Sequence, residues 1–228
     1  MITSTELASK IDHTLLKPDA TYENIKKICE EAIEYNFASV CILPNYVIYA
    51  KDLLCGTAVK LCTVIGFPLG ANVTPVKLYE MDEAIENGAN EVDIVVNNSF
   101  LKNQDVERYA EEIVLMNKIA KELGATTKFI IETALLTNEE KVKATEIVVN
   151  AGADFVKTST GFAASGATIE DVTLMKKICS GTNTKIKASG GIRSLEFTLN
   201  LIQAGAERIG TSSGIVIMKE FHNFDINQ

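Results

Sequence analysis

Short apolar runs alternate with amphipathic segments along almost the whole chain, and this alternation constrains the fold more than any other feature. The runs are rich in Val and Ile and mostly lack strict polar alternation, which is typical of strands buried on both faces of a parallel sheet. Residues 10–13 are the candidate for a first strand, and further runs follow at residues 38–43, 60–65, 91–96, 128–132, 154–158, 185–188 and 207–210.

The segments between the runs carry the signals of helix ends. Thr74 and Pro75 predict an N-cap followed by proline at the first helical position. Apolar residues recur at helical spacing between Asp105 and Leu123, which predicts a long amphipathic helix. Capping boxes are predicted at Thr3 with Glu6 and at Thr137 with Glu140. Glycine is expected to end the helices that precede three of the runs, at Gly88, Gly152 and Gly205.

The repeated order of strand and helix predicts a barrel. Eight strand–helix units in 228 residues favour a single (β/α)8 TIM barrel over residues 1–228, with a short N-terminal leading helix. A doubly wound open sheet is the alternative. Such a sheet more often carries a GxGxxG motif after its first strand, and the sequence has none.

Composition excludes several classes of function. The 22 basic and 30 acidic residues give a net charge of −8, which disfavours binding to nucleic acid or to an anionic membrane. No run approaches the roughly 18 apolar residues of a membrane span, and the N-terminus shows no secretory signal. Five cysteines without a CxxC pair and only two histidines predict reduced thiols, a cytoplasmic location and no metal site.

Three charged residues interrupt the apolar runs: Asp93, Lys157 and Lys187. Because side chains alternate across a strand, Asp93 points away from its neighbours Val92 and Ile94. If the apolar neighbours pack against helices, the three charged side chains point into the barrel. An unpaired charge is costly there, and a perturbed pKa is useful. The alternative is a buried ion pair without a catalytic role, or lysines that reach a rim.

These three residues together suggest Schiff-base chemistry. An amine nucleophile must be neutral, and burial beside a second cation favours the neutral form. Lys157 and Lys187 lie on consecutive predicted strands and can form such a pair, while Asp93 can move protons to and from a carbinolamine.

Glycines after the same strands predict a phosphate site. Gly190 and Gly191 follow the strand of Lys187, and residues 210–214 follow the last strand and open a terminal helix. Loops after strands seven and eight that end on a helix N-terminus are the usual phosphate cradle of barrels. Gly161, after Lys157, adds another open backbone donor.

Several strings of the sequence resemble the deoxyribose-phosphate aldolase family. They are IDHTLL at 11–16, SVCILP at 39–44, EVDIVVN at 91–97, DFVKTSTGF at 154–162, KASGGIR at 187–193 and IGTSSG at 209–214. The resemblance implies a class I aldolase on a (β/α)8 barrel that needs no metal or other cofactor. It also implies the reversible cleavage of 2-deoxy-D-ribose 5-phosphate to D-glyceraldehyde 3-phosphate and acetaldehyde, a step of deoxyribose catabolism.

The resemblance further implies a role for each matching residue. Lys157 would be the Schiff-base nucleophile, Lys187 the second lysine that favours its neutral form and relays protons, and Asp93 the general acid/base. The matches to phosphate-binding positions are Gly161, Gly190, Gly191, Ser212 and Ser213, and the matches near the substrate's hydroxyls are Asp12 and Thr160. Several members of the family end in a tyrosine that helps proton transfer. The last tyrosine of this chain is Tyr109, so we expect slower enamine protonation.

Two other functions fit the residues when the resemblance is set aside. Another Schiff-base barrel, such as a transaldolase or a keto-acid sugar-phosphate aldolase, would use the same lysines with a different donor. A phosphometabolite-binding barrel without chemistry would need the glycine cradle alone. The resemblance favours the acetaldehyde-dependent aldolase, and because the family is often dimeric it adds a homodimer as an expectation.

Overall fold

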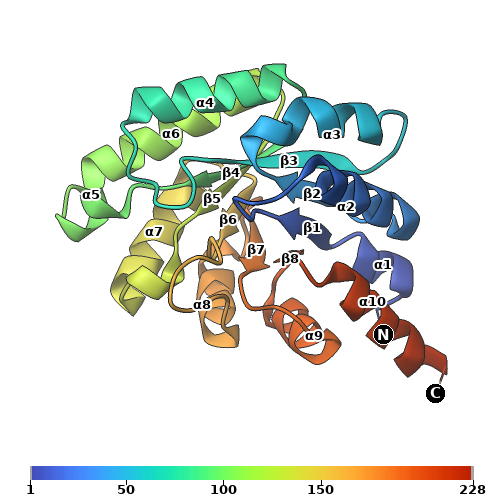
Figure 1. The fold of residues 1–228 in the computed structure, drawn as a ribbon. Helices are drawn as coiled ribbons and strands as arrows, with labels where there is room; N and C mark the ends of the chain where they lie inside the picture. Colours follow the sequence, from blue (N-terminus) through green and yellow to red (C-terminus); the bar gives the residue numbers. More distant parts are fainter. Residues whose placement is uncertain (1, 227–228) are drawn as a thin grey trace.

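Eight parallel strands close into a barrel in the computed structural model, which describes residues 2–226 (Figure 1). The strands are β1 (Ile11–Leu15), β2 (Ser39–Ile42), β3 (Lys60–Ile65), β4 (Glu91–Val95), β5 (Thr126–Ile130), β6 (Phe155–Lys157), β7 (Lys185–Ser189) and β8 (Arg208–Thr211). Each pairs with its neighbours in sequence, and β1 closes the ring against β8. The predicted TIM barrel is therefore confirmed. The last two residues, where the chain has no terminal tyrosine, lie outside the described residues.

Helices form the outer layer of the barrel (Figure 1). The predicted leading helix is α1 (Ser4–Ala8), and it packs against α10 (Gly214–Ile226). The other α-helices are α2 (Tyr22–Tyr35), α3 (Val47–Leu54), α4 (Thr74–Glu86), α5 (Asn98–Lys102), α6 (Val106–Glu122), α7 (Asn138–Asn150), α8 (Ile169–Cys179) and α9 (Leu195–Ala204), and two short 3-10 helices are η1 (Pro44–Tyr46) and η2 (Thr133–Leu135).

The predicted helix ends are confirmed with one exception. Both capping boxes form, at Thr3 with Glu6 and at Thr137 with Glu140. The left-handed glycines Gly88, Gly152 and Gly205 follow the ends of α4, α7 and α9. The prediction for Thr74 was wrong, because Val73 is the N-cap of α4 and Thr74 is its first helical residue. The Thr74 hydroxyl instead donates to the Glu112 carboxylate at 2.8 Å, which ties α4 to α6.

The fifth strand lies two residues earlier than its apolar run indicates. It spans Thr126–Ile130 rather than 128–132, because Glu132 adopts a left-handed backbone (φ 51°, ψ 71°) that cannot continue a strand. Lys128 therefore stands at the centre of β5 and not at its start.

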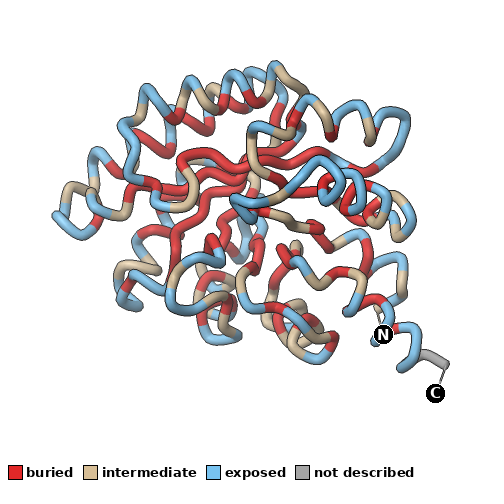
Figure 2. Tube along the Cα trace, viewed as in Figure 1, coloured by how far each residue is buried: buried red, intermediate tan, exposed pale blue. Residues whose placement is uncertain are grey.

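Apolar side chains fill the layer between the barrel and its helices, and the strands are buried along most of their length (Figure 2). Val92 and Ile94 belong to this layer, while Asp93 between them contacts groups on other strands across the barrel. The alternation along β4 thus directs its apolar side chains outward and its carboxylate inward. In the part of the chain that the structure describes, no helix combines the length and the hydropathy needed to cross a bilayer.

Candidate active site

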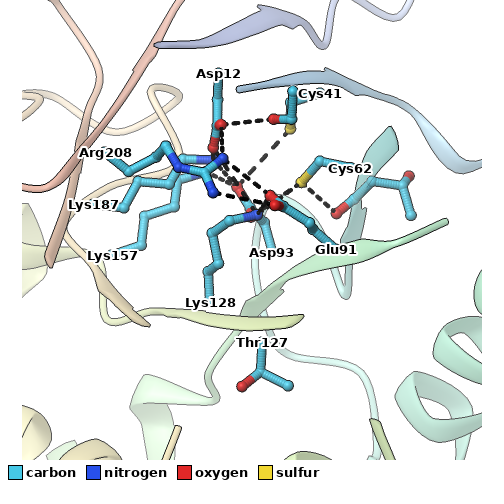
Figure 3. A network of polar contacts seen from close by, with 12 residues as sticks. Asp12, Cys41, Cys62, Glu91, Asp93, Thr127, Lys128, Lys157, Lys187 and Arg208 are labelled. Carbon is cyan, nitrogen blue, oxygen red and sulfur yellow. Dashed lines mark hydrogen bonds and ion pairs between the residues drawn. The ribbon is translucent and has the colours of Figure 1, made fainter. Parts of the chain in front are cut away.

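The three predicted charged residues meet inside the barrel (Figure 3). Lys157 on β6 and Lys187 on β7 are register partners, so their side chains project from neighbouring strands at the same level. Their ammonium nitrogens lie 2.7 and 2.6 Å from the same atom, Oδ2 of Asp93 on β4. All three residues are almost completely buried. The structure thus brings together the residues for which the sequence predicted a shared function.

Asp93 is held as a carboxylate. Burial opposes its ionisation, but the ammonium groups of Lys128, Lys157 and Lys187 outweigh burial and hold the pKa of Asp93 well below its usual value. The carboxylate therefore stays charged at neutral pH, as an acceptor shared between several cations.

Lys187 is held as a cation by two carboxylates. Burial would lower the pKa of Lys187, but Asp12 and Asp93, at 2.5 and 2.6 Å from its nitrogen, raise the pKa above its usual range. Burial would raise the pKa of Asp12, but the positive charges of Lys187 and Arg208 outweigh burial, so the pKa of Asp12 lies below its usual value. Asp12 lies within this ionic network, where it also accepts a hydrogen bond from Ser39 at 2.6 Å.

Lys128 is the member of the cluster that the sequence analysis missed. Its ammonium contacts Glu91 at 2.6 Å and Asp93 Oδ1 at 2.9 Å, and it is fully buried. Arg208 pairs with Glu91 and Asp12 on the other side. The alternation of Lys128 with the apolar Phe129 could have indicated an inward lysine. The predicted run begins at Lys128, however, and a charged residue at the start of a strand is expected to face solvent.

Two thiols complete the surroundings of Asp93. Cys41 on β2 and Cys62 on β3 are register partners, and both donate to the Asp93 carboxylate, at 3.9 and 3.2 Å. With Asp93 they form a set of donor atoms within 4.8 Å of one another, as a metal site requires. The Lys128 ammonium lies 3.2 Å from the Cys62 sulfur, and burial raises the pKa of that thiol well above its usual value. A set whose carboxylate is already neutralised by ammonium groups and whose Cys62 sulfur keeps its proton fits a divalent cation poorly.

A cavity of about 230 Å³ opens at the carboxyl ends of the strands. Of the three inward lysines, Lys157 lines this cavity, whereas Lys128 and Lys187 lie in the network below it. Carboxyl ends of barrel strands are where TIM-barrel enzymes place their active sites. Two lysines line the cavity, Lys157 and the exposed Lys17, and of these two only Lys157 stands on a barrel strand and contacts the ionic network.

The predicted glycine cradle forms one wall of the same cavity. Its lining includes five of the seven predicted binding residues, namely Thr160, Gly161, Gly190, Gly191 and Ser212. Ser213 is not among the lining residues; its amide donates to the Thr211 hydroxyl at 2.9 Å, directly before α10 begins. Asp12 does not line the cavity either. The N-terminus of α10 adds a partial positive charge beside the cradle, which favours an anion.

The comparison with known proteins identifies the family. A family model described as DeoC/LacD family aldolase matches residues 7–220. The chain belongs to this family. As a DeoC/LacD family aldolase, it is 54% identical over 221 residues to a deoxyribose-phosphate aldolase of Carboxydothermus hydrogenoformans, covering 96% of each chain. It is also 54% identical over 216 residues to the enzyme of Thermococcus kodakarensis, covering 94% of this chain and 96% of that one.

Solved structures support the same assignment. This family member superposes on the tetrameric deoxyribose-phosphate aldolase of Aeropyrum pernix with a TM-score of 0.91 at 36% identity. The superposition covers 97% of this chain and 93% of the Aeropyrum chain. The family assignment, reached by resemblance from short strings of residues, is confirmed over nearly the full length.

Proposed function

We propose that the protein is a deoxyribose-phosphate aldolase, which reversibly cleaves 2-deoxy-D-ribose 5-phosphate to D-glyceraldehyde 3-phosphate and acetaldehyde through a Schiff base on Lys157. The observation that carries the mechanism is the position of Lys157, which lines the cavity while its nitrogen contacts the carboxylate that Lys187 also contacts. The substrate is inferred from relatives that are named as this enzyme at 54% identity.

The first step needs a neutral amine. In the proposed step the Lys157 nitrogen reacts as the neutral amine, while Lys187 holds a positive charge on the Asp93 oxygen that both nitrogens contact. The nitrogen lone pair then attacks the aldehyde carbon of the sugar to give a carbinolamine. Loss of water gives a protonated imine, and Asp93 and Lys187 accept and return the protons that this requires.

Cleavage uses the imine as an electron sink. The hydroxyl proton on the third sugar carbon passes to the Asp93 carboxylate, directly or through water, and the electrons of the bond between the second and third carbons move towards the iminium nitrogen. D-glyceraldehyde 3-phosphate departs and an enamine remains on Lys157. Protonation of the enamine carbon and hydrolysis release acetaldehyde and restore the amine.

The glycine cradle is proposed to hold the phosphate. Backbone N–H groups at Gly161, Gly190 and Gly191 and the Ser212 hydroxyl are the proposed donors, since all four residues line the cavity. Ser213 is proposed on the resemblance alone, and Thr160, which also lines the cavity, is proposed to meet a sugar hydroxyl. Asp12 is assigned a supporting role, because its carboxylate contacts Lys187 and not the cavity. The five free thiols suit a reducing compartment, so we place the reaction in the cytoplasm.

A cleavage assay tests this function. The purified protein with 2-deoxy-D-ribose 5-phosphate should release acetaldehyde and D-glyceraldehyde 3-phosphate in equal amounts, and Lys157→Met should abolish the release while leaving the fold intact. A protein that binds the sugar phosphate without cleaving it would instead be a binding barrel. Cleavage of a ketose phosphate alone would assign it to a different Schiff-base aldolase.

A further inference from the structure

Glu132 lies two residues beyond the end of β5 and touches the loop that leaves the catalytic strand β6. We propose that Glu132 is a positioning residue, which sets the geometry of residues 160–162 so that they bind the phosphorylated substrate beside Lys157. The proposal rests on the function proposed above, and it assigns to the enzyme a residue that acts through Thr160 rather than on the substrate itself.

The backbone around Glu132 is fastened to the strand that carries Lys157. The amide of Ile131 donates to the carbonyl of Lys157 at 3.0 Å, and the amide of Thr133 donates to the carbonyl of Thr158 at 2.9 Å. Glu132 lies between these two hydrogen bonds, so its side chain is fixed relative to β6 and the residues that follow it.

The carboxylate of Glu132 holds the loop by two contacts to one residue. Its Oε2 accepts a hydrogen bond from the Thr160 amide at 3.1 Å and another from the Thr160 hydroxyl. That hydroxyl oxygen in turn accepts from the amide of Phe162 at 3.1 Å. Thr160, Gly161 and Phe162 all line the cavity. One carboxylate oxygen therefore organises three consecutive residues of the cavity wall.

Two further features distinguish Glu132 from a residue kept for packing. It adopts a left-handed backbone, which is unfavourable for a residue with a side chain and persists only where the surroundings hold it. It is also 96% buried, yet its Oε1 has no hydrogen-bond partner, and no described residue forms an ion pair with it. A buried carboxyl oxygen without a hydrogen-bond partner is costly, and such groups concentrate at functional sites.

Two substitutions of Glu132 separate the effect of side-chain length from the effect of charge. Glu132→Gln keeps the length and an oxygen acceptor, so the loop geometry should survive and KM for 2-deoxy-D-ribose 5-phosphate should stay within about threefold of wild type. Glu132→Asp keeps the charge but withdraws the acceptor by one methylene, so KM should rise about tenfold or more. If the charge of Glu132 were the important property, KM would rise more in Glu132→Gln than in Glu132→Asp.

A second readout separates loop positioning from damage to the chemistry. Acetaldehyde has no phosphate and does not need the loop at residues 160–162, so borohydride trapping of acetaldehyde should proceed in Glu132→Asp at the wild-type rate. Glu112→Asp is the matched control, because Glu112 is an equally buried glutamate that binds Lys77 outside the barrel. It should lower the melting temperature and leave KM unchanged.

The result that overturns the proposal is a Glu132→Asp enzyme with wild-type KM, or one whose KM changes no more than that of Glu132→Gln. Loss of acetaldehyde trapping in proportion to the loss of cleavage would also overturn it, because it would place the defect at Lys157. A wild-type protein without aldolase activity would refute the proposed function itself, an outcome that the wild-type assay reveals before any variant is compared.

Discussion

Lys157 and Lys187 share one oxygen atom. Their nitrogens lie 2.7 and 2.6 Å from Oδ2 of Asp93, although only Lys157 of the two lines the cavity. The two lysines differ in their other contacts, because Lys187 also binds Asp12 at 2.5 Å, whereas Lys157 forms its described ion pair with Asp93 alone. The contacts hold Lys187 as a cation in the free protein and leave Lys157, the one of the two that lines the cavity, for the reaction with substrate.

Removing the Lys187 charge should impair the reaction more than the substrate affinity. In Lys187→Met the volume is roughly kept, but the cation beside Lys157 and a proton carrier are both lost. We expect kcat to fall by about 100-fold or more. The rate of borohydride trapping with acetaldehyde should also fall, because Lys187 takes part in the proton transfers that form the imine. An unchanged kcat with an unchanged trapping rate would contradict the role given to Lys187.

Stability should fall at both extremes of pH, for reasons of opposite sign. The pKa values of Asp12 and Asp93 lie below their usual 3.8 in the folded protein, so their contribution is complete above that value and is lost as pH falls below it. The pKa values of Lys128 and Lys187 lie above their usual 10.5, so their contribution is complete below that value and is lost as pH rises beyond it.

Urea unfolding across pH measures this dependence. The free energy of unfolding should be nearly flat between about pH 7 and 9 and should decline on both sides, first on the acid side at buried His13, whose pKa lies below its usual 6.5. Asp12→Asn should have a lower free energy of unfolding at neutral pH and a shallower decline below pH 4, since it has one carboxylate fewer to protonate. An acid decline as steep as that of wild type would show that Asp12 does not contribute in the way described.

A buried ion pair outside the barrel should affect stability alone. Lys77 is fully buried, and its ammonium donates to Glu112 at 2.8 Å and to the carbonyl of Val95 at 2.9 Å. Lys77→Met leaves the Glu112 carboxylate without its cation, which should lower the free energy of unfolding by about 3 to 5 kcal/mol. KM and kcat should stay near wild type, and a large loss of kcat at a temperature where the variant is folded would contradict this separation.

Gly190 should be required for binding the phosphate group of the substrate and not for binding its sugar. It has φ 86°, and a Cβ there would lie 2.9 Å from the Cα of Gly166. Gly190→Ala should therefore distort the cradle and raise KM for the phosphorylated sugar by about tenfold or more. The kcat/KM for unphosphorylated 2-deoxy-D-ribose should change much less.

Gly181 provides the control for that substitution. It has a similar φ of 80°, but a Cβ there meets no atom within 4 Å, and the residue does not line the cavity. Gly181→Ala carries the same backbone strain and should lower stability without a selective effect on the phosphorylated substrate. Equal effects of the two glycine variants on both substrates would argue against the cradle.

The sequence was sufficient for the parts of the site that depend on local alternation. Asp93, Lys157 and Lys187 each interrupt an apolar strand, and alternation alone directs them to one face. Lys128 escaped notice because the start of β5 was misplaced by two residues. The start was misplaced because β5 begins with Thr126 and Thr127, which lie outside the apolar run. The end was misplaced because Glu132 has a left-handed backbone, which no local pattern indicates since contacts with the β6 loop hold it.

The position of Asp12 below the cavity could not be predicted from the sequence, because it depends on contacts between distant parts of the chain. Asp12 matches a substrate-binding position by resemblance, but its place below the cavity follows from pairing with Lys187 and Arg208, which come from the far end of the chain. Such pairings join residues nearly two hundred positions apart. Only the closure of β1 against β8 brings them together.

The most direct measurement is borohydride reduction of the protein with acetaldehyde, followed by digestion and peptide mapping. The account predicts a single ethyl group on the nitrogen of Lys157 and none on Lys128 or Lys187, both of which carry a proton held by neighbouring carboxylates. An ethyl group on Lys187 in place of Lys157, or no adduct on any of the three lysines, would contradict the account.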